Sequence, residues 1–328
     1  MTRIITALAL AFISALTGTQ PAFAQQAPRK IVFLTDAGPL GRHSLFFVAV
    51  AKGYYKEEGL DVEILGGRGS AATIREVAAG AATFGFADAG TLILSRANEA
   101  VPVKMVGIVY AQAPHGLMAL AESGIKGPQD LKGKKLADTS ASSNYILFKA
   151  YAQKVGLDPK SVEWIFTDFN SLPGLLATRQ VDAIGQFSMG KPMLQKRAGG
   201  REITFLSYAS AGMEFYSNVV IASDETIARD PKLVSSFLRA TERGMKDAFA
   251  NPAEAAELMR KHLPLLEADI IASETKNVGE LANPAERKDK RMLVLDPAKV
   301  NQTLSVIQEN FELKNKISAE DVSATIEF

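Results

Sequence analysis

Two segments combine residue types that can hold a small ligand, and each is expected to stand between a strand and a helix. The first is the glycine turn Gly67-Arg68-Gly69 with Ser70 and Ala71, and the second opens a later helix with Ser140, Ser142, Ser143, Asn144 and Tyr145. Backbone N–H groups at a helix N-terminus favour carboxylate, sulfonate or carbonyl oxygens. The same residues also suit a plain strand-to-helix turn or a helix cap without a ligand.

Charged side chains near these segments add candidate contacts. Asp36 and His43 flank the loop 38–41 after the first predicted strand, at the edge where open α/β sheets bind ligands. They are also the candidate acid/base pair if the chain is an enzyme. Asp36 and Asp88 would repel an anion unless Arg68 offsets them, which favours a neutral or amine-bearing ring compound. Arg68 and the two helix N-termini suit a sulfonate or carboxylate equally well.

Aromatic residues at predicted strand ends and helix starts could sandwich a flat ligand or fill the core. They are Phe86, Tyr110, Tyr145, Phe187 and Tyr216.

Neither a metal nor a cofactor is expected. The three histidines, His43, His115 and His262, show no metal-ligand spacing, and the chain has no cysteine. The glycine turn with Asp88 matches part of a dinucleotide fingerprint. That fingerprint normally follows the first strand of its domain, whereas a complete strand and helix precede the turn here.

Strands and helices alternate along the chain, which predicts an α/β fold with mostly parallel sheets. The first set comprises strands at 30–35, 61–65, 83–87 and 103–110 and helices at 45–55, 71–79 and 91–97. The second comprises strands at 131–138, 162–167 and 181–185 and helices at 145–155 and 172–178. Segments 77–85 and 176–184 echo each other as helix end, tight turn and strand, which indicates two copies of one plan and hence two lobes.

The C-terminal part is predicted to return to the first lobe. Strand 216–222 precedes three helices led by proline, at 231–250, 252–262 and 297–311, and the charged stretch 283–291 is predicted to be a solvated loop. We expect residues 25–113 and 219–328 to form lobe I and residues 114–218 to form lobe II.

Residues 1–24 have the features of a cleaved secretory signal peptide: Arg3, an apolar run at 4–16, and Ala22-Phe23-Ala24 before Gln25. The apolar run is shorter than the roughly 20 residues that a membrane-spanning helix needs. No cysteine is present for lipid attachment, so we expect a periplasmic protein that is not a lipoprotein. Without Arg3 the chain has 36 basic and 36 acidic residues, which suggests neither a nucleic-acid partner nor an anionic membrane surface.

Residues 48–63, VAVAKGYYKEEGLDVE, resemble the opening of a family of ABC-importer binding proteins for thiamine-pyrimidine precursors, aliphatic sulfonates, taurine and nitrate. Residues 125–135, IKGPQDLKGKK, are similar to the start of that family's second lobe, and the resemblance runs from about residue 30 to 222. It implies a type II periplasmic-binding fold: two Rossmann-like lobes joined by two hinge strands, with crossings near 112–118 and 208–219, which close on a ligand.

The resemblance also implies where the site lies. The family's pocket segments fall at Asp36 with His43, at 69–71, at Asp88, at 140–145 and at Phe187. It further implies a monomer whose partners are a small-molecule ligand and the membrane permease of an ABC transporter. Many pyrimidine-precursor members have an aromatic residue where this chain has Thr35 and Asp36. The cysteine-rich motif of related eukaryotic pyrimidine synthases is also missing, so an enzyme is not expected.

Three functions stay open at this point. The first is the binding component of an importer, with a pyrimidine-like or other ring compound as ligand, or alternatively a sulfonate or carboxylate. The second is an exported enzyme on the same scaffold that uses His43 and Asp36. The third is a periplasmic sensor subunit, which shares the fold and differs only in its partner.

Overall fold

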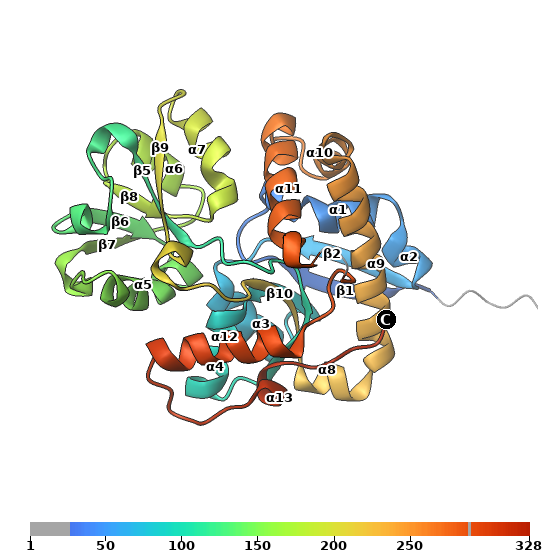
Figure 1. Ribbon diagram of the computed structural model, residues 1–328. Helices are drawn as coiled ribbons and strands as arrows, with labels where there is room; N and C mark the ends of the chain where they lie inside the picture. The colour runs from blue at the N-terminus through green and yellow to red at the C-terminus, as the bar shows by residue number, and fades with distance from the viewer. Residues whose placement is uncertain (1–26, 288–289) are drawn as a thin grey trace, which may run out of the picture.

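The computed structural model of the chain describes residues 27–287 and 290–328 (Figure 1). The predicted signal peptide, residues 1–24, lies outside the described residues. Within the described ranges, no helix has both the length and the apolar character needed to cross a membrane.

Two five-stranded sheets form the centres of two lobes. The first has the order β2 (Leu60–Leu65), β1 (Arg29–Leu34), β3 (Phe84–Asp88), β10 (Asn218–Ser223), β4 (Val103–Ile108). The second has the order β7 (Glu163–Phe166), β6 (Lys135–Asp138), β8 (Ala183–Gly185), β5 (Gly116–Leu120), β9 (Ile203–Ser207). We call the body around the first sheet lobe I and the body around the second lobe II. The α/β, two-lobed class expected from the sequence is therefore confirmed.

The two sheets share one topology. In each, four strands run in one direction and one runs against both of its neighbours: β10 in lobe I and β5 in lobe II. Each of these reversed strands is the first strand after a crossing between the lobes, because β5 follows segment 109–115 and β10 follows segment 208–217. The predicted lobe boundaries at 113/114 and 218/219 lie in or beside these crossings. That they separate two bodies that move independently stays a prediction.

Helices cover both sheets (Figure 1). Those of lobe II are α5 (Ser143–Lys154), α6 (Leu172–Ala177) and α7 (Lys191–Arg197). Those of lobe I are α1 (Ser44–Ala51), α2 (Tyr54–Glu57), α3 (Ser70–Ala78), α4 (Ala89–Glu99), α8 (Asp224–Arg229), α9 (Pro231–Ala250), α10 (Pro252–Arg260), α11 (Ala268–Ala282), α12 (Pro297–Asn310) and α13 (Ala319–Val322). The C-terminal helices pack on lobe I as expected: α9 lies against α1 and α12 against α4.

The structure corrects several predicted elements. The helix expected at 45–55 is divided into α1 and α2, because Gly53 adopts a left-handed conformation (φ +78°) that ends the first helix. The strand expected at 131–138 begins only at Lys135, after a turn at Gly133 (φ +74°). Strand β9 and helices α7 and α11 had no sequence prediction, and β5 was expected only as part of a crossing.

The charged stretch 283–291 is not simply a solvated loop. The guanidinium group of Arg287 is buried and donates to the Tyr216 hydroxyl at 3.0 Å and to the carbonyls of Arg291 and Val294 at 3.3 and 3.2 Å. A buried cation needs such acceptors, and Tyr216, Arg291 and Val294 supply them.

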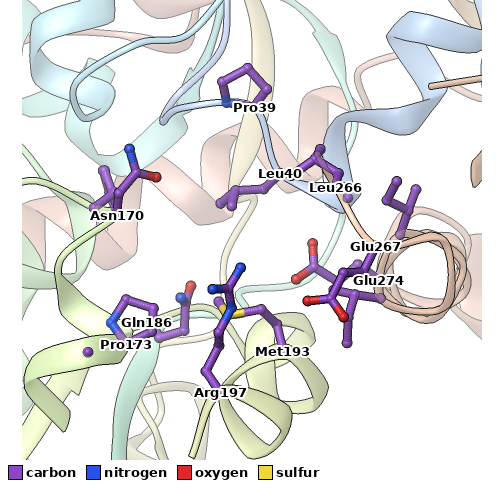
Figure 2. A pocket seen from close by; sticks show the side chains of 15 residues that line it. Pro39, Leu40, Asn170, Pro173, Gln186, Met193, Arg197, Leu266, Glu267 and Glu274 are labelled. Carbon is purple, nitrogen blue, oxygen red and sulfur yellow. The ribbon is translucent and has the colours of Figure 1, made fainter. Parts of the chain in front are cut away.

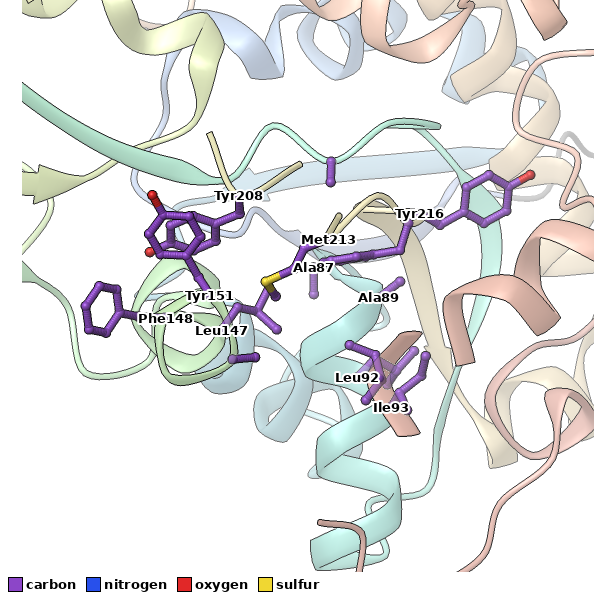
Figure 3. Packing of buried hydrophobic residues seen from close by; sticks show 14 of the residues in the cluster. Ala87, Ala89, Leu92, Ile93, Leu147, Phe148, Tyr151, Tyr208, Met213 and Tyr216 are labelled. Carbon is purple, nitrogen blue, oxygen red and sulfur yellow. The ribbon is translucent and has the colours of Figure 1, made fainter. Parts of the chain in front are cut away.

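Hydrophobic packing is continuous between the lobes on the side of the crossings (Figure 3). Leu147 and Tyr151 of α5 belong to the same buried cluster as Leu92 and Ile93 of α4, with Met213 from the second crossing among them. The lobes are thus packed together beside the two crossings.

Candidate functional site

A cavity with a volume of about 490 Å³ lies between the lobes, and we call it the main cavity (Figure 2). Lobe I contributes the loop after β1, the two residues before α11 and the first half of α11. Lobe II contributes the loop after β7, the start of α6, the residue after β8, and α7. The lining residues are Pro39, Leu40, Gly41, Phe169, Asn170, Pro173, Gly174, Gln186, Met193, Arg197, Leu266, Glu267, Ile270, Ile271 and Glu274. A cavity of this size falls in the range of small-molecule sites, roughly 300–1,000 Å³.

Most of the cavity wall is apolar, and a few polar groups converge on it. One of them is the amide of Gln186, which is buried, and its Oε1 accepts the backbone N–H of Phe187 at 2.9 Å. The Nε2 end of Gln186 therefore remains as the donor that this side chain can offer. Asn170, Arg197 and Glu274 add further polar groups to the wall. Apolar walls with a few placed polar groups are typical of sites that bind small organic molecules.

Glu274 is a buried carboxyl group on the cavity wall. Its Oε2 accepts the backbone N–H of Arg42 at 2.9 Å. Burial raises the pKa of Glu274 to about 7, against the charge of Arg42 and this hydrogen bond, which act to lower it. Near neutral pH this group can therefore hold a proton or accept a hydrogen bond from a ligand.

Behind the cavity, Asp36 and His43 form part of a buried polar cluster. Asp36 accepts from Arg42 Nη2 at 3.1 Å, from Asn218 Nδ2 at 2.9 Å, and contacts His43 Nε2 at 2.8 Å. Burial alone would raise the pKa of Asp36, but the Arg42 charge and the bonds from His43 and Asn218 hold it well below its usual range. Asp36 is therefore an ionised carboxylate whose oxygens are occupied by the protein itself.

Both ring nitrogens of His43 also form hydrogen bonds within the protein. The backbone N–H of Leu40 donates to Nδ1 at 3.1 Å, so Nε2 carries the proton and donates to Asp36. Burial lowers the pKa of His43, although the nearby Asp36 carboxylate acts to raise it. The lowered pKa keeps the ring neutral. His43 does not line the cavity, and its role in this structure is to position Asp36 and the loop after β1.

Six of the predicted ligand residues come together at a narrow junction between the lobes. They are Asp36, Ser70, Ser142, Ser143, Asn144 and Phe187, and they surround a space of about 10 Å³ together with Arg42, Phe169 and Gln186. The Arg42 guanidinium crosses from lobe I and lies 5.0 Å from the ring centre of Phe187. With the lobes this close, the space has room for about one water molecule.

Arg68 and Ser140 lie elsewhere, in an open groove of about 440 Å³ on another part of the junction. Arg68 is strongly exposed and pairs with Glu76 at 3.2 Å. Tyr145 packs edge-on against Trp164 and Phe166, with ring centres 5.0 and 4.8 Å apart. The structure therefore does not bring these three predicted residues to the main cavity.

Gly69, Ala71 and Asp88 are engaged in contacts within the protein. Gly69 N–H donates to the Asp36 carbonyl at 2.9 Å, and Ala71 N–H donates across the junction to the Ala141 carbonyl of lobe II at 3.2 Å. Asp88 caps α4 by accepting from Thr91 N–H at 2.7 Å, and its Oδ2 lies 3.0 Å from His115 Nε2. In this arrangement the N-terminus of α3 joins the two lobes and Asp88 is a helix cap.

Sequence reasoning missed the residues that line the main cavity. Phe169 and Asn170 follow β7 at the carboxyl end of a lobe II strand, as Asp36 follows β1 in lobe I, so the strand-end rule would have found them. Glu274 and Arg197 belong to α11 and α7, which had not been predicted. A signal for α11 was present, because Ile271, Thr275, Val278 and Ala282 recur at helical spacing and are buried.

Comparisons with known proteins agree with this architecture. A 23% identical formylaminopyrimidine-binding protein from Halalkalibacterium halodurans aligns over 99% of this chain and 98% of its own length. The riboflavin-binding protein RibY of Chloroflexus aurantiacus is 31% identical over 67% of this chain and 62% of that protein. A 4-amino-5-hydroxymethyl-2-methylpyrimidine phosphate synthase from Legionella pneumophila is 28% identical over 68% of this chain and 71% of its own length.

Among solved structures, the periplasmic aliphatic sulphonate binding protein SsuA of Escherichia coli shares the fold, with a TM-score of 0.64, 15% identity and coverage of 92% of this chain and 93% of that one. The model of the family described as NMT1/THI5 like matches residues 41–255, which include strands of both sheets and, after β10, α8, α9 and the start of α10. This chain belongs to the NMT1/THI5-like family.

Proposed function

We propose that this chain is the periplasmic solute-binding component of an ABC importer, which captures a small organic molecule between its lobes and delivers it to the permease. The observation that carries the proposal is the cavity of about 490 Å³ whose walls come from both lobes. A ligand that touches both walls stabilises the closed arrangement, and closure in turn buries the ligand. Relatives named for binding formylaminopyrimidine and riboflavin support this function.

The ligand proposed first is a pyrimidine-like or other ring compound. Phe169, Met193, Leu40 and Ile271 give the cavity apolar surfaces against which a flat ring can pack. Asp36 and Asp88 accept hydrogen bonds from other groups of the protein. The acid that could bind the amine of a ligand is therefore Glu274, which lines the cavity.

A sulfonate or carboxylate ligand is the second candidate, and Arg197 is the observation that favours it. This side chain lines the cavity, and it has no ion-pair partner within the parts of the chain that the structure describes. A guanidinium group can bind a carboxylate or sulfonate through two parallel hydrogen bonds.

An exported enzyme is the alternative of another class, and one relative is named as a synthase. The pair that such an enzyme would use, His43 and Asp36, is buried, and its polar atoms bond to Leu40, Arg42 and Asn218. A general base must reach the proton that it removes, and this pair does not line the main cavity. We therefore propose that no bond is made or broken in the ligand.

The test is a thermal-shift screen of the purified protein, beginning at Gln25, across pyrimidines, flavins, aromatic acids, amino acids and sulfonates. A true ligand at 1,000 times its dissociation constant should stabilise the fold by about 4 kcal/mol. Mass spectrometry of the released ligand should show an unchanged mass. Appearance of a product that is lost in His43→Ala would show that the chain is an enzyme, and stimulation of a kinase instead of a permease would identify a sensor subunit.

A further inference from the structure

Two groups of opposite charge line the main cavity, one from each lobe (Figure 2). Glu274 belongs to α11 of lobe I, and Arg197 is the last residue of α7 in lobe II. Among the described residues no ion pair joins them, so the space between the two groups is open to a ligand.

The charge of Glu274 is not neutralised by a cation of its own. Arg42 donates only its backbone N–H to Glu274, at 2.9 Å, while its guanidinium donates to Asp36 at 3.1 and 3.3 Å. A buried carboxylate has about four acceptor positions, and a single hydrogen bond leaves most of them unused. Taking up a donor or a positive charge would therefore relieve the cost of burying it.

Arg197 has no ion-pair partner among the described residues, whereas the neighbouring Lys196 pairs with two acids. Lys196 pairs with Glu267 at 2.5 Å and with Asp269 at 2.8 Å. Glu267 is the other acid that lines the cavity, and this pairing commits it to Lys196. Arg197 is exposed, so its contribution to binding is screened more than that of the buried Glu274.

We propose that the ligand is dipolar: a basic nitrogen group donates to Glu274 of lobe I, a carboxylate or sulfonate accepts from Arg197 of lobe II, and an apolar or aromatic body lies between them. This inference rests on the proposed binding function and names the class of ligand. Because the two contacts are on different lobes, a dipolar ligand is favoured only when the lobes are closed, and each charged end adds to closure.

Isothermal titration at pH 8 with matched probes tests the assignment. The dipolar probes are 3- and 4-(aminomethyl)benzoate, the amine-only probe is 4-methylbenzylamine, and the acid-only probe is 4-methylbenzoate. At least one dipolar probe should bind at least tenfold more tightly than both single-charge probes. Glu274→Gln should remove the advantage over the acid-only probe, and Arg197→Gln should reduce the advantage over the amine-only probe by a smaller factor, about threefold.

Glu163→Gln and Arg229→Gln are the matched controls, because both residues are exposed and neither lines the cavity. They should leave all four affinities unchanged. Circular dichroism and melting curves of the two cavity variants check that they are folded. Equal binding of dipolar and single-charge probes, binding of none of them, or a preference that survives in both cavity variants would overturn the assignment. Tight binding of an uncharged ring compound or a simple alkanesulfonate would also overturn it, while leaving the proposed binding function intact.

Discussion

The ionisation of Glu274 should make the protein less stable as the pH rises from about 4.5 to about 7. Its pKa is about 7 in the folded chain, mainly because of burial, against an ordinary value of 4.5. Between these values the folded chain binds a proton that the unfolded chain has lost, so the free energy of unfolding falls as the pH rises. The full penalty is present above about pH 7 and amounts to about 3 kcal/mol. The charged and titratable groups around it are Arg42, Arg197, Glu267 and Tyr110.

Glu274→Gln removes this titration and keeps an oxygen for the Arg42 backbone N–H. Urea denaturation between pH 5 and 8.5 should give similar stabilities near pH 5 and a variant that is more stable than the wild type by up to about 3 kcal/mol at pH 8.5. Asp138, whose pKa burial raises to about 8, titrates in both proteins, so only the difference between the two curves reports on Glu274. Glu163→Gln should follow the wild type. The reasoning would be refuted if the difference in unfolding free energy between the variant and the wild type did not change with pH, or if the variant were the less stable of the two at pH 8.5.

Four further outcomes follow from named contacts. In Gly69→Ala the new Cβ would lie 2.5 Å from the Ala141 carbonyl of the other lobe at a backbone φ of +114°, so small-angle scattering should show a more open protein and ligand affinity should fall by about tenfold or more. Lys196→Met removes the ion contacts from α7 of lobe II to Glu267 and Asp269 of lobe I, which hold the lobes together. Ligand affinity should therefore fall by a few-fold at low salt and by less at high salt. Phe237→Ala deletes a ring that stacks 4.2 Å from Phe84 and should destabilise the chain by about 3–5 kcal/mol in denaturation. N-terminal sequencing of the exported protein should begin at Gln25, and any other start would disprove the predicted cleavage site.

Much of the architecture could be read from local patterns. Alternating strands and helices identified an α/β fold, and the echo between 77–85 and 176–184 ends in β3 and β8, which occupy the third place in their respective sheets. The missed elements were harder to recognise for different reasons. Helix α11 carries buried residues at helical spacing but has no leading proline like those of α9, α10 and α12, and strand β9 is a five-residue edge strand of its sheet. Their positions are fixed by packing on distant parts of the chain.

The site was only partly predictable from the sequence, because hydrogen-bond partners that are distant in the sequence determine whether a polar side chain is free to bind a ligand. The strand-end rule correctly placed Asp36 and the start of α5 at the junction of the lobes. It could not show that Asn218, 182 residues later, bonds to Asp36 and occupies one of its oxygens. Nor could it bring Glu274 from the C-terminal part of the chain to the loop after β1, since that contact arises only from tertiary packing.

Two aspartates at equivalent places in the two lobes differ in their ionisation. This difference determines which residues are left to interact with a charged ligand. β1 and β6 occupy the same place in their sheets, and each is followed or ended by an aspartate, Asp36 and Asp138. In lobe I, Arg42 keeps Asp36 ionised and is itself held toward Phe187. In lobe II, burial raises the pKa of Asp138 to about 8, with only hydrogen bonds such as that from Thr139 N–H at 2.7 Å to oppose it. Asp36 is thus compensated and Asp138 is protonated near neutral pH, so neither adds an uncompensated charge to the junction. The charges that remain for a ligand are those on the facing helices, which is why the cavity chemistry depends on Glu274 and Arg197.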